Sequence, residues 1–160
     1  MTLTHVLLGV TAVTTGLFTG LLMTILFFFQ RALKDLSGPE FALVMQRFLG
    51  IVRTHPLNYI MVIVSGTAPI VALVTMRDNP GSPAFVFALL GSLAFWCGSI
   101  LPSRFSAEPI YDVFLSWEAD APPKEWQRSR EKYFRLNVIR GLGSGVAFVC
   151  FVVSLAVLAP

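Results

Sequence analysis

Four long stretches without a charged residue constrain this chain more than any other feature of its sequence. These stretches are residues 1–30, 57–76, 80–103 and 141–160. A helix needs about 20 mainly apolar residues to cross the hydrocarbon core of a bilayer, and lipid offers the backbone no hydrogen-bond partners, so helix is the conformation that spanning stretches must adopt. We therefore predict an all-α fold, an integral membrane four-helix bundle with spans at about 6–29, 57–76, 84–101 and 141–159.

The composition agrees with a chain that is solvated largely by lipid. Only 13% of its residues are charged, against about 25% in a typical soluble protein. Its length of 160 residues suits a single membrane domain, residues 1–160. The net charge of +3 is mild, and no Lys/Arg block alternates with aromatic residues, so a nucleic-acid partner is excluded.

The first apolar stretch is expected to be a retained span and not a cleaved signal peptide. It has no basic residue at its start, and its apolar part from Val6 to Phe29 is longer than the 7–15 residues of a usual signal core. No A-x-A cleavage pattern follows it.

Basic residues predict the orientation of the bundle. With four spans, segments 31–56 and 102–140 lie on one side of the membrane, and they carry all Lys and Arg residues except Arg77. Basic residues favour the cytoplasmic side. We expect both long loops in the cytoplasm and both termini outside it, in the plasma (inner) membrane if the source is bacterial.

Both long loops carry a short amphipathic helix in this prediction. After Ser37-Gly38-Pro39, apolar residues recur at helical spacing from Phe41 to Val52. In the second loop the same spacing runs from Ile110 to Trp117, with Ser106 as the expected N-cap. We expect these two helices to lie on the membrane surface.

One face of the last helix carries the residues most suited to chemistry. Steps of four and three residues place one set of side chains on a single stripe, namely Trp126, Arg130, Tyr133, Asn137, Arg140 and Ser144. Polar groups at the start of a span are costly unless they face the bundle or a wet cavity. The stripe predicts either a pocket for a flat ligand with polar edges or an anchor in which Arg140 reaches the lipid headgroups.

Glycines predict how the spans approach one another. Gly16 and Gly20 in the first span, and Gly141 and Gly145 in the last, are spaced four residues apart. Such pairs allow helices to approach closely, so we expect all four to lie in helix–helix contacts.

His55 is the candidate general base, because its imidazole titrates near neutral pH. It precedes Pro56, which begins the second span at the same membrane level as Arg140. The alternative is that His55 simply precedes the helix. His5 lies on the opposite side of the membrane and no span contains a carboxylate, so we predict no metal site.

The stripe is part of a longer pattern that resembles the anthrone oxygenase family of small four-helix membrane proteins. The pattern covers nearly the whole chain, and its motifs are Gly16-x-x-x-Gly20, Met45-Gln46-Arg47, His55-Pro56-Leu57-Asn58, Pro109-Ile110-Tyr111-Asp112, Trp117, Pro122-Pro123-Lys124-Glu125-Trp126, Arg130, Tyr133, Asn137 and Arg140. Two positions depart from it: the family usually has Asn at the position of Tyr111 and Trp at that of Tyr133. Both changes would alter the edge of a pocket.

The resemblance implies oxidation of an anthrone to an anthraquinone by molecular oxygen, without a cofactor. In this reading His55 removes the ring proton, and Arg140 and Asn137 hold the resulting oxyanion. The implied substrate-binding residues are Trp117, Trp126, Arg130, Tyr133, Asn58 and Arg47. The expected partners are membrane lipid and an aromatic or quinone-like small molecule.

A second class of function stays open at this point. The chain is then a non-enzymatic membrane protein that serves as a partner-binding or structural subunit, and the stripe is its interface. The sequence does not determine whether the chain forms a homo-oligomer. Transport is disfavoured, because the spans carry neither a carboxylate relay nor an inverted repeat.

Overall fold

The structure, a computed structural model, describes residues 2–158. Four helices within them are long and apolar enough to cross a membrane, namely Leu3–Lys34, Pro56–Thr75, Pro83–Leu115 and Trp126–Ala156. The prediction of an all-helical chain with four membrane-length helices is therefore confirmed. The third and fourth of these helices extend well beyond the uncharged stretches, and the first extends beyond its stretch by about one turn, so the bundle continues outside the apolar region.

Each of two long helices is built from several segments that join without a break. The first comprises α1 (Leu3–Thr24), the π-helical η1 (Ile25–Phe29) and α2 (Gln30–Lys34). The third comprises α5 (Pro83–Phe95), η2 (Trp96–Ile100), η3 (Ser103–Ala107) and α6 (Glu108–Leu115).

The expected N-cap at Ser106 is wrong. Ser106 lies inside η3, and the helix continues through it into α6 with no side-chain cap at that junction. A cap serves the unpaired N–H groups of a helix start, and a helix that never stops has none there. The wider π turns take the place of a break, and such turns are frequent at functional sites.

Two of the remaining helices, α3 and α4, begin where the sequence supplies a cap. In α3 (Gly38–Val52), Ser37 and Glu40 form a capping box, with the Ser37 N–H and Oγ both donating to Glu40 Oε2. This pair of bonds lowers the pKa of the exposed Glu40. In α4 (Pro56–Thr75), Pro56 occupies the first turn, where a missing N–H costs nothing. The last helix, α7 (Trp126–Ala156), is about 46 Å long at 1.5 Å per residue.

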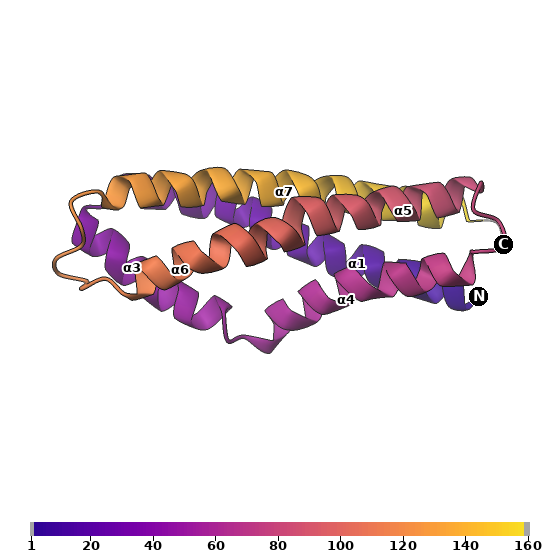
Figure 1. Cartoon of the computed structure of the whole chain (residues 1–160), viewed down its shortest axis with the longest axis horizontal. Helices are drawn as coiled ribbons and strands as arrows, with labels where there is room; N and C mark the ends of the chain where they lie inside the picture. The colour runs from indigo at the N-terminus through magenta and orange to yellow at the C-terminus, as the bar shows by residue number, and fades with distance from the viewer. Residues whose placement is uncertain (1, 159–160) are drawn as a thin grey trace.

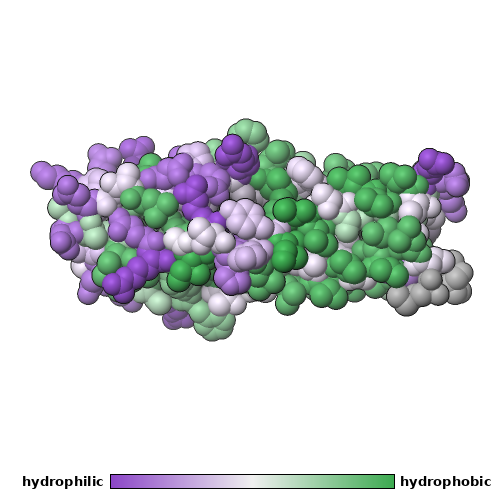
Figure 2. Space-filling view, turned by 90° about the horizontal axis from the view of Figure 1, so that it is seen from below, coloured by the Kyte–Doolittle hydropathy of each residue, from purple (hydrophilic) through white to green (hydrophobic). Residues whose placement is uncertain are grey.

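The long helices pack side by side along one axis (Figure 1). α5 packs along α7, and α1 packs against both α4 and α7, whereas α4 and α5 contact each other less extensively. The start of α1, the α4–α5 turn and the end of α7 lie at one end, and α3 and α6 lie at the other. Figure 2 shows apolar residues over the part nearer the α4–α5 turn and hydrophilic residues gathered over the opposite end.

Glycines allow the closest helix contacts, but only some of those expected. A Cβ on Gly16 would lie 2.8 Å from the ring of Phe148, and one on Gly141 would lie 2.5 Å from Leu26. The expectation for Gly20 is wrong, because nothing lies within 4 Å of it. Gly145 faces only ordinary contacts at 3.7 Å or more.

Another close approach joins the backbones of two glycines that the sequence pattern did not indicate. A Cβ on Gly98 of η2 would lie 2.6 Å from the Cα of Gly143 in α7. Backbone therefore meets backbone where these two helices cross.

The polar end of the molecule has a core of its own, which we call the head. It joins α3, α6 and the first turns of α7, and its buried residues are Leu33, Phe41, Met45, Leu49, Ala107, Ile110, Tyr111, Phe114, Tyr133 and Leu136. The apolar faces of α3 and α6, which we expected to rest on the membrane surface, pack into this core instead. Each short helix buries its face against the other and against α7, whose first half extends past the apolar region and offers a partner.

Candidate functional site

A cavity of about 390 Å³ lies where the head joins the apolar bundle. This volume falls within the range of about 300–1,000 Å³ that is typical of small-molecule sites. Its apolar wall is formed by Phe18, Leu21, Leu22, Ile25, Phe48, Val52, Val62 and Ile100. Its polar residues are Arg53, Asn58, Tyr59, Ser103, Arg104, Glu108, Tyr111, Tyr133 and Arg140.

The cavity exists because α4 leaves the bundle at this level. α3 and α4 meet at the short 53–55 link and diverge from the long helices (Figure 1). All three π-helical segments also contribute to the wall, through Ile25 of η1, Ile100 of η2 and Ser103 of η3. The weak contact between α4 and the third helix leaves the space unfilled.

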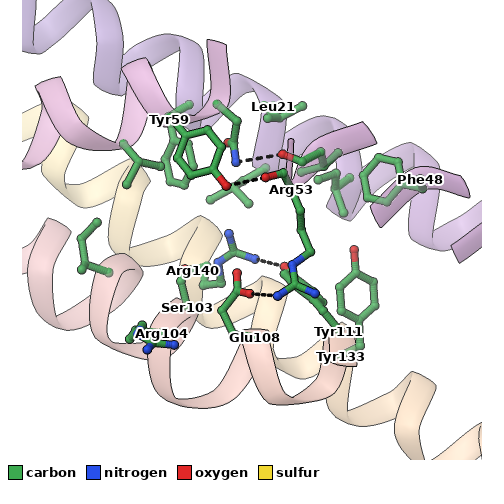
Figure 3. Close-up of a pocket in the computed structure, with 17 residues that line it drawn as sticks. Leu21, Phe48, Arg53, Tyr59, Ser103, Arg104, Glu108, Tyr111, Tyr133 and Arg140 are labelled. Carbon is green, nitrogen blue, oxygen red and sulfur yellow. Dashed lines mark hydrogen bonds and ion pairs between the residues drawn. The ribbon is translucent and has the colours of Figure 1, made fainter. Parts of the chain in front are cut away.

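Arg140 forms the polar corner of the cavity. Its Nη1 donates to the hydroxyl of Tyr111 at 2.8 Å (Figure 3). The same Nη1 donates to Asn137 Oδ1 at 3.2 Å. Its Nε is buried and has no hydrogen-bond partner, and the same holds for Nδ2 of the fully buried Asn137. Ser99 Oγ donates to the Arg140 carbonyl at 3.1 Å. The guanidinium is thus held in place with donor capacity to spare.

A second arginine, Arg53, fastens the end of α3 to α6. Its guanidinium pairs with Glu108 at 2.6 Å and with Asp112 at 2.9 Å. Only Glu108 of these two carboxylates lines the cavity. The hydrogen bond to Asp112 is the largest of the effects that raise the pKa of Arg53, so this side chain remains a cation bound to its carboxylates.

The link between α3 and α4 is held by side chains that turn back onto it. The Tyr59 hydroxyl donates to the Arg53 carbonyl, and Asn58 Nδ2 donates to the Val52 carbonyl at 3.3 Å. These bonds satisfy carbonyls at the end of α3 that have no helical partner. The Asn58 and Tyr59 side chains are thereby fixed along one edge of the cavity.

The arrangement suits an amphiphilic ligand. Its apolar wall can take flat rings, because burial of apolar surface is favourable at about 25 cal/mol per Å². Its polar corner offers a guanidinium, a hydroxyl and a carboxylate at one end. Hydrogen bonds are stronger in such a partly dry site than in water, so one oxygen atom of a ligand at Arg140 would be bound strongly.

The predicted stripe on α7 does face inward, but it serves two places. Tyr133 and Arg140 line the cavity, and Asn137 lies directly behind Arg140. Trp126 and Arg130 belong to the head, where the Arg130 guanidinium stacks 4.8 Å from the Trp126 ring centre. Arg130 Nη1 also donates to the carbonyl of Lys34 at the end of α2.

Two other predicted ligand contacts lie away from the cavity. Trp117 packs against the rings of Phe41 and Phe114 in the head. Arg47 is an exposed residue on the outer side of α3 and is not among the lining residues.

His55 does not line the cavity. It is the exposed N-cap of α4, and its Nδ1 accepts a hydrogen bond from the Leu57 N–H at 3.3 Å. Of the residues predicted for catalysis, the structure thus brings together Arg140 and Asn137 and leaves His55 apart. Asn58, from the same motif as His55, does line the cavity.

Sequence reasoning missed several polar residues that line the cavity. Glu108, Arg53 and Tyr59 all line the cavity. Each lies next to a motif that was recognised, since Glu108 precedes Pro109, Arg53 lies just before His55 and Tyr59 follows Asn58. Nothing in their local sequence indicated that they meet.

Within residues 2–158, no three His, Cys, Asp or Glu side chains lie close enough together to hold a metal ion.

Comparison with known proteins finds no family model, no curated protein and no solved structure that matches the chain.

Proposed function

We propose that this protein binds a flat, mainly apolar small molecule in the cavity and oxidises it with molecular oxygen, as the resemblance to anthrone oxygenases implies. The observation that carries the proposal is Arg140, a guanidinium at the polar corner of a largely apolar cavity with a buried Nε that has no partner. Such a group stabilises negative charge that develops on a bound oxygen.

The reaction needs a base and an oxyanion site. Loss of a proton from the central CH₂ carbon of an anthrone places negative charge on the carbonyl oxygen, which Arg140 would hold. The carbanion then forms a bond to O₂, and the peroxide loses water to give the second carbonyl. One anthrone and one O₂ thus yield one anthraquinone and one water.

Glu108 is the base in this proposal, because it is the carboxylate among the lining residues. A carboxylate base beside donors for an enolate oxygen is an established pairing in carbon-acid chemistry. The His55 ring is engaged at the exposed start of α4 and does not line the cavity. We therefore assign the proton transfer that the resemblance gave to His55 to Glu108 instead.

The test is oxygen uptake by purified protein in detergent with an anthrone such as emodin anthrone, compared with the spontaneous rate. Glu108→Gln should lower the enzymatic rate by roughly 100-fold, a common contribution of a general base. Asp112→Asn is the matched control, because Asp112 also pairs with Arg53 but does not line the cavity. It should retain most of the activity.

The outcomes separate the alternatives. A large loss with His55→Ala and none with Glu108→Gln would overturn the assignment of the base. Wild-type rates equal to those of Arg140→Gln and Glu108→Gln across several anthrones would refute the oxygenase. The chain would then be better described as a binding or structural subunit.

A further inference from the structure

The charges around the cavity leave an excess of positive charge. The lining residues Arg53, Arg104 and Arg140 are cations, and Glu108 is the anion that faces them. Asp112 joins from outside the lining by its bond to Arg53, so three cations are balanced by two anions. Both carboxylates are bound to Arg53, and Arg140 takes part in none of the ion pairs within 4.0 Å among residues 2–158.

Of the three tyrosines that line the cavity, Tyr59 and Tyr111 differ in whether the hydroxyl hydrogen is already used. The Tyr59 hydroxyl already donates its hydrogen to the Arg53 carbonyl. The Tyr111 hydroxyl accepts from Arg140 Nη1 at 2.8 Å, and no acceptor for its own hydrogen is found among residues 2–158. A phenol has one hydrogen to donate, so that of Tyr111 is free for a ligand.

We propose that the cavity binds the ionised form of a phenol or enol oxygen more tightly than the neutral form, and that Tyr111 is the residue that sets this selectivity together with Arg140. The inference rests on the ligand site of the proposed function and adds the charge state of the ligand. An oxyanion accepts from Arg140 and Tyr111 at once, whereas an ether oxygen of the same shape carries no charge and accepts weaker bonds from the same donors. The apolar wall strengthens the attraction between such an oxyanion and the Arg140 guanidinium, because it excludes water that would screen the two charges.

The experiment uses 2-hydroxyanthraquinone and its methyl ether, which share three rings and differ in the ionisable oxygen. Ionisation of the hydroxyl changes the colour of the compound, so its pKa is measured by absorbance in detergent with and without the full-length protein. Binding should lower the pKa of the hydroxyl by about 1 to 2 units, as one or two charge-assisted hydrogen bonds would. The hydroxy compound should bind roughly 10- to 100-fold more tightly than the ether above that pKa.

Variants separate a role in selectivity from a general effect on the fold. Arg140→Gln should abolish the pKa shift, and Tyr111→Phe should reduce it by about half while leaving the affinity for the ether nearly unchanged. Tyr59→Phe is the matched control, because it removes a hydroxyl from the same cavity whose hydrogen is already used. It should leave the affinity ratio between the two compounds as in the wild type.

Other titratable side chains near the ligand are Arg53, Arg104, Glu108, Asp112, Tyr59 and Tyr133. Glu108→Gln removes the carboxylate from the lining, so it should enlarge the pKa shift of the ligand hydroxyl by removing a nearby negative charge. This variant distinguishes an effect of net charge from an effect of Tyr111. Should Arg140→Gln fail to fold, the wild-type titration and Tyr111→Phe still decide the matter.

The failures are distinguishable. If both compounds bind equally and the pKa of the hydroxyl is unshifted, the cavity takes flat rings but does not select an ionised oxygen, and the present inference is overturned. If neither compound binds, the proposed function fails for this class of ligand. If Tyr59→Phe and Tyr111→Phe reduce the shift equally, Tyr111 has no special role.

Discussion

Replacement of Gly98 by alanine tests a close helix contact in which backbone meets backbone. The added Cβ would lie 2.6 Å from the Cα of Gly143, about 1 Å inside the 3.5–4.0 Å at which carbon atoms attract. The neighbour is backbone and cannot move aside by a change of rotamer. α5, η2 and α7 would therefore have to separate along the most extensive contact of the bundle.

The size of the effect follows from two opposing contributions. Overpacking of a tight contact costs about 3 kcal/mol at the upper end of the usual range. Alanine in place of glycine in a helix returns about 1 kcal/mol. We expect Gly98→Ala to lower the free energy of unfolding by about 2 kcal/mol, which is the difference between these two contributions.

Gly20→Ala is the matched control. Gly20 is also in a long apolar helix, but nothing lies within 4 Å of the position of its Cβ. This variant should be as stable as the wild type or up to about 1 kcal/mol more stable. Unfolding of both variants in mixed micelles, followed by circular dichroism as the fraction of denaturing detergent rises, measures the difference. Equal stability of Gly98→Ala and Gly20→Ala would refute the close approach of η2 and α7.

Three further outcomes follow from the structure and the sequence. Arg140→Lys should lower ligand binding and oxygen uptake at least tenfold, because a single ammonium can replace the Nη1 that contacts Tyr111 and Asn137 but not the additional donors of the planar guanidinium, such as the unpartnered Nε; a silent lysine variant would favour a headgroup anchor. The Ser37–Glu40 capping box should make stability acid-sensitive: the pKa of Glu40 is lowered from 4.5 in the folded chain, so its contribution is present above about pH 4.5 and is lost as the pH falls through the lowered value. Thermal melts from pH 6 to pH 3 should show this loss in the wild type and a smaller loss in Ser37→Ala, which removes the Oγ donor and keeps the backbone N–H. A reporter active only outside the cytoplasm should work when fused after Pro160 and fail in the loop before Trp126; the reverse pattern would overturn the orientation.

Part of the candidate site followed from the sequence. The steps of three and four residues placed Tyr133, Asn137 and Arg140 on one face of α7, and the cost of polar groups near a span directed that face inward. Burial of Tyr133 and Asn137 agrees with this reasoning. Local spacing could not predict which residues of the stripe line the cavity and which belong to the head, where Arg130 stacks on Trp126.

The other half of the site depended on segments far apart in the chain. Glu108 and Arg53 meet because the third helix runs on through its π turns and brings α6 under the end of α3. His55 and Asn58 share one motif, yet they point to different places, because the first caps a helix start and the second lies one turn along it. A helix start was expected at Ser106, because residue types that cap helices are easy to recognise in a sequence. The sequence does not show where a helix continues through a π-helical segment such as η3.

The sequence by itself determined the four membrane-length helices, because the length of an apolar run and the need to satisfy backbone hydrogen bonds in lipid are local properties. It also determined that α3 and α6 are amphipathic. Only the tertiary structure decided what covers those two faces, which glycines touch, and where the cavity opens. These depend on how each helix is rotated and how far it leans from its neighbours, and that is set by steric contacts between residues such as Gly98 and Gly143, which are 45 positions apart in the chain.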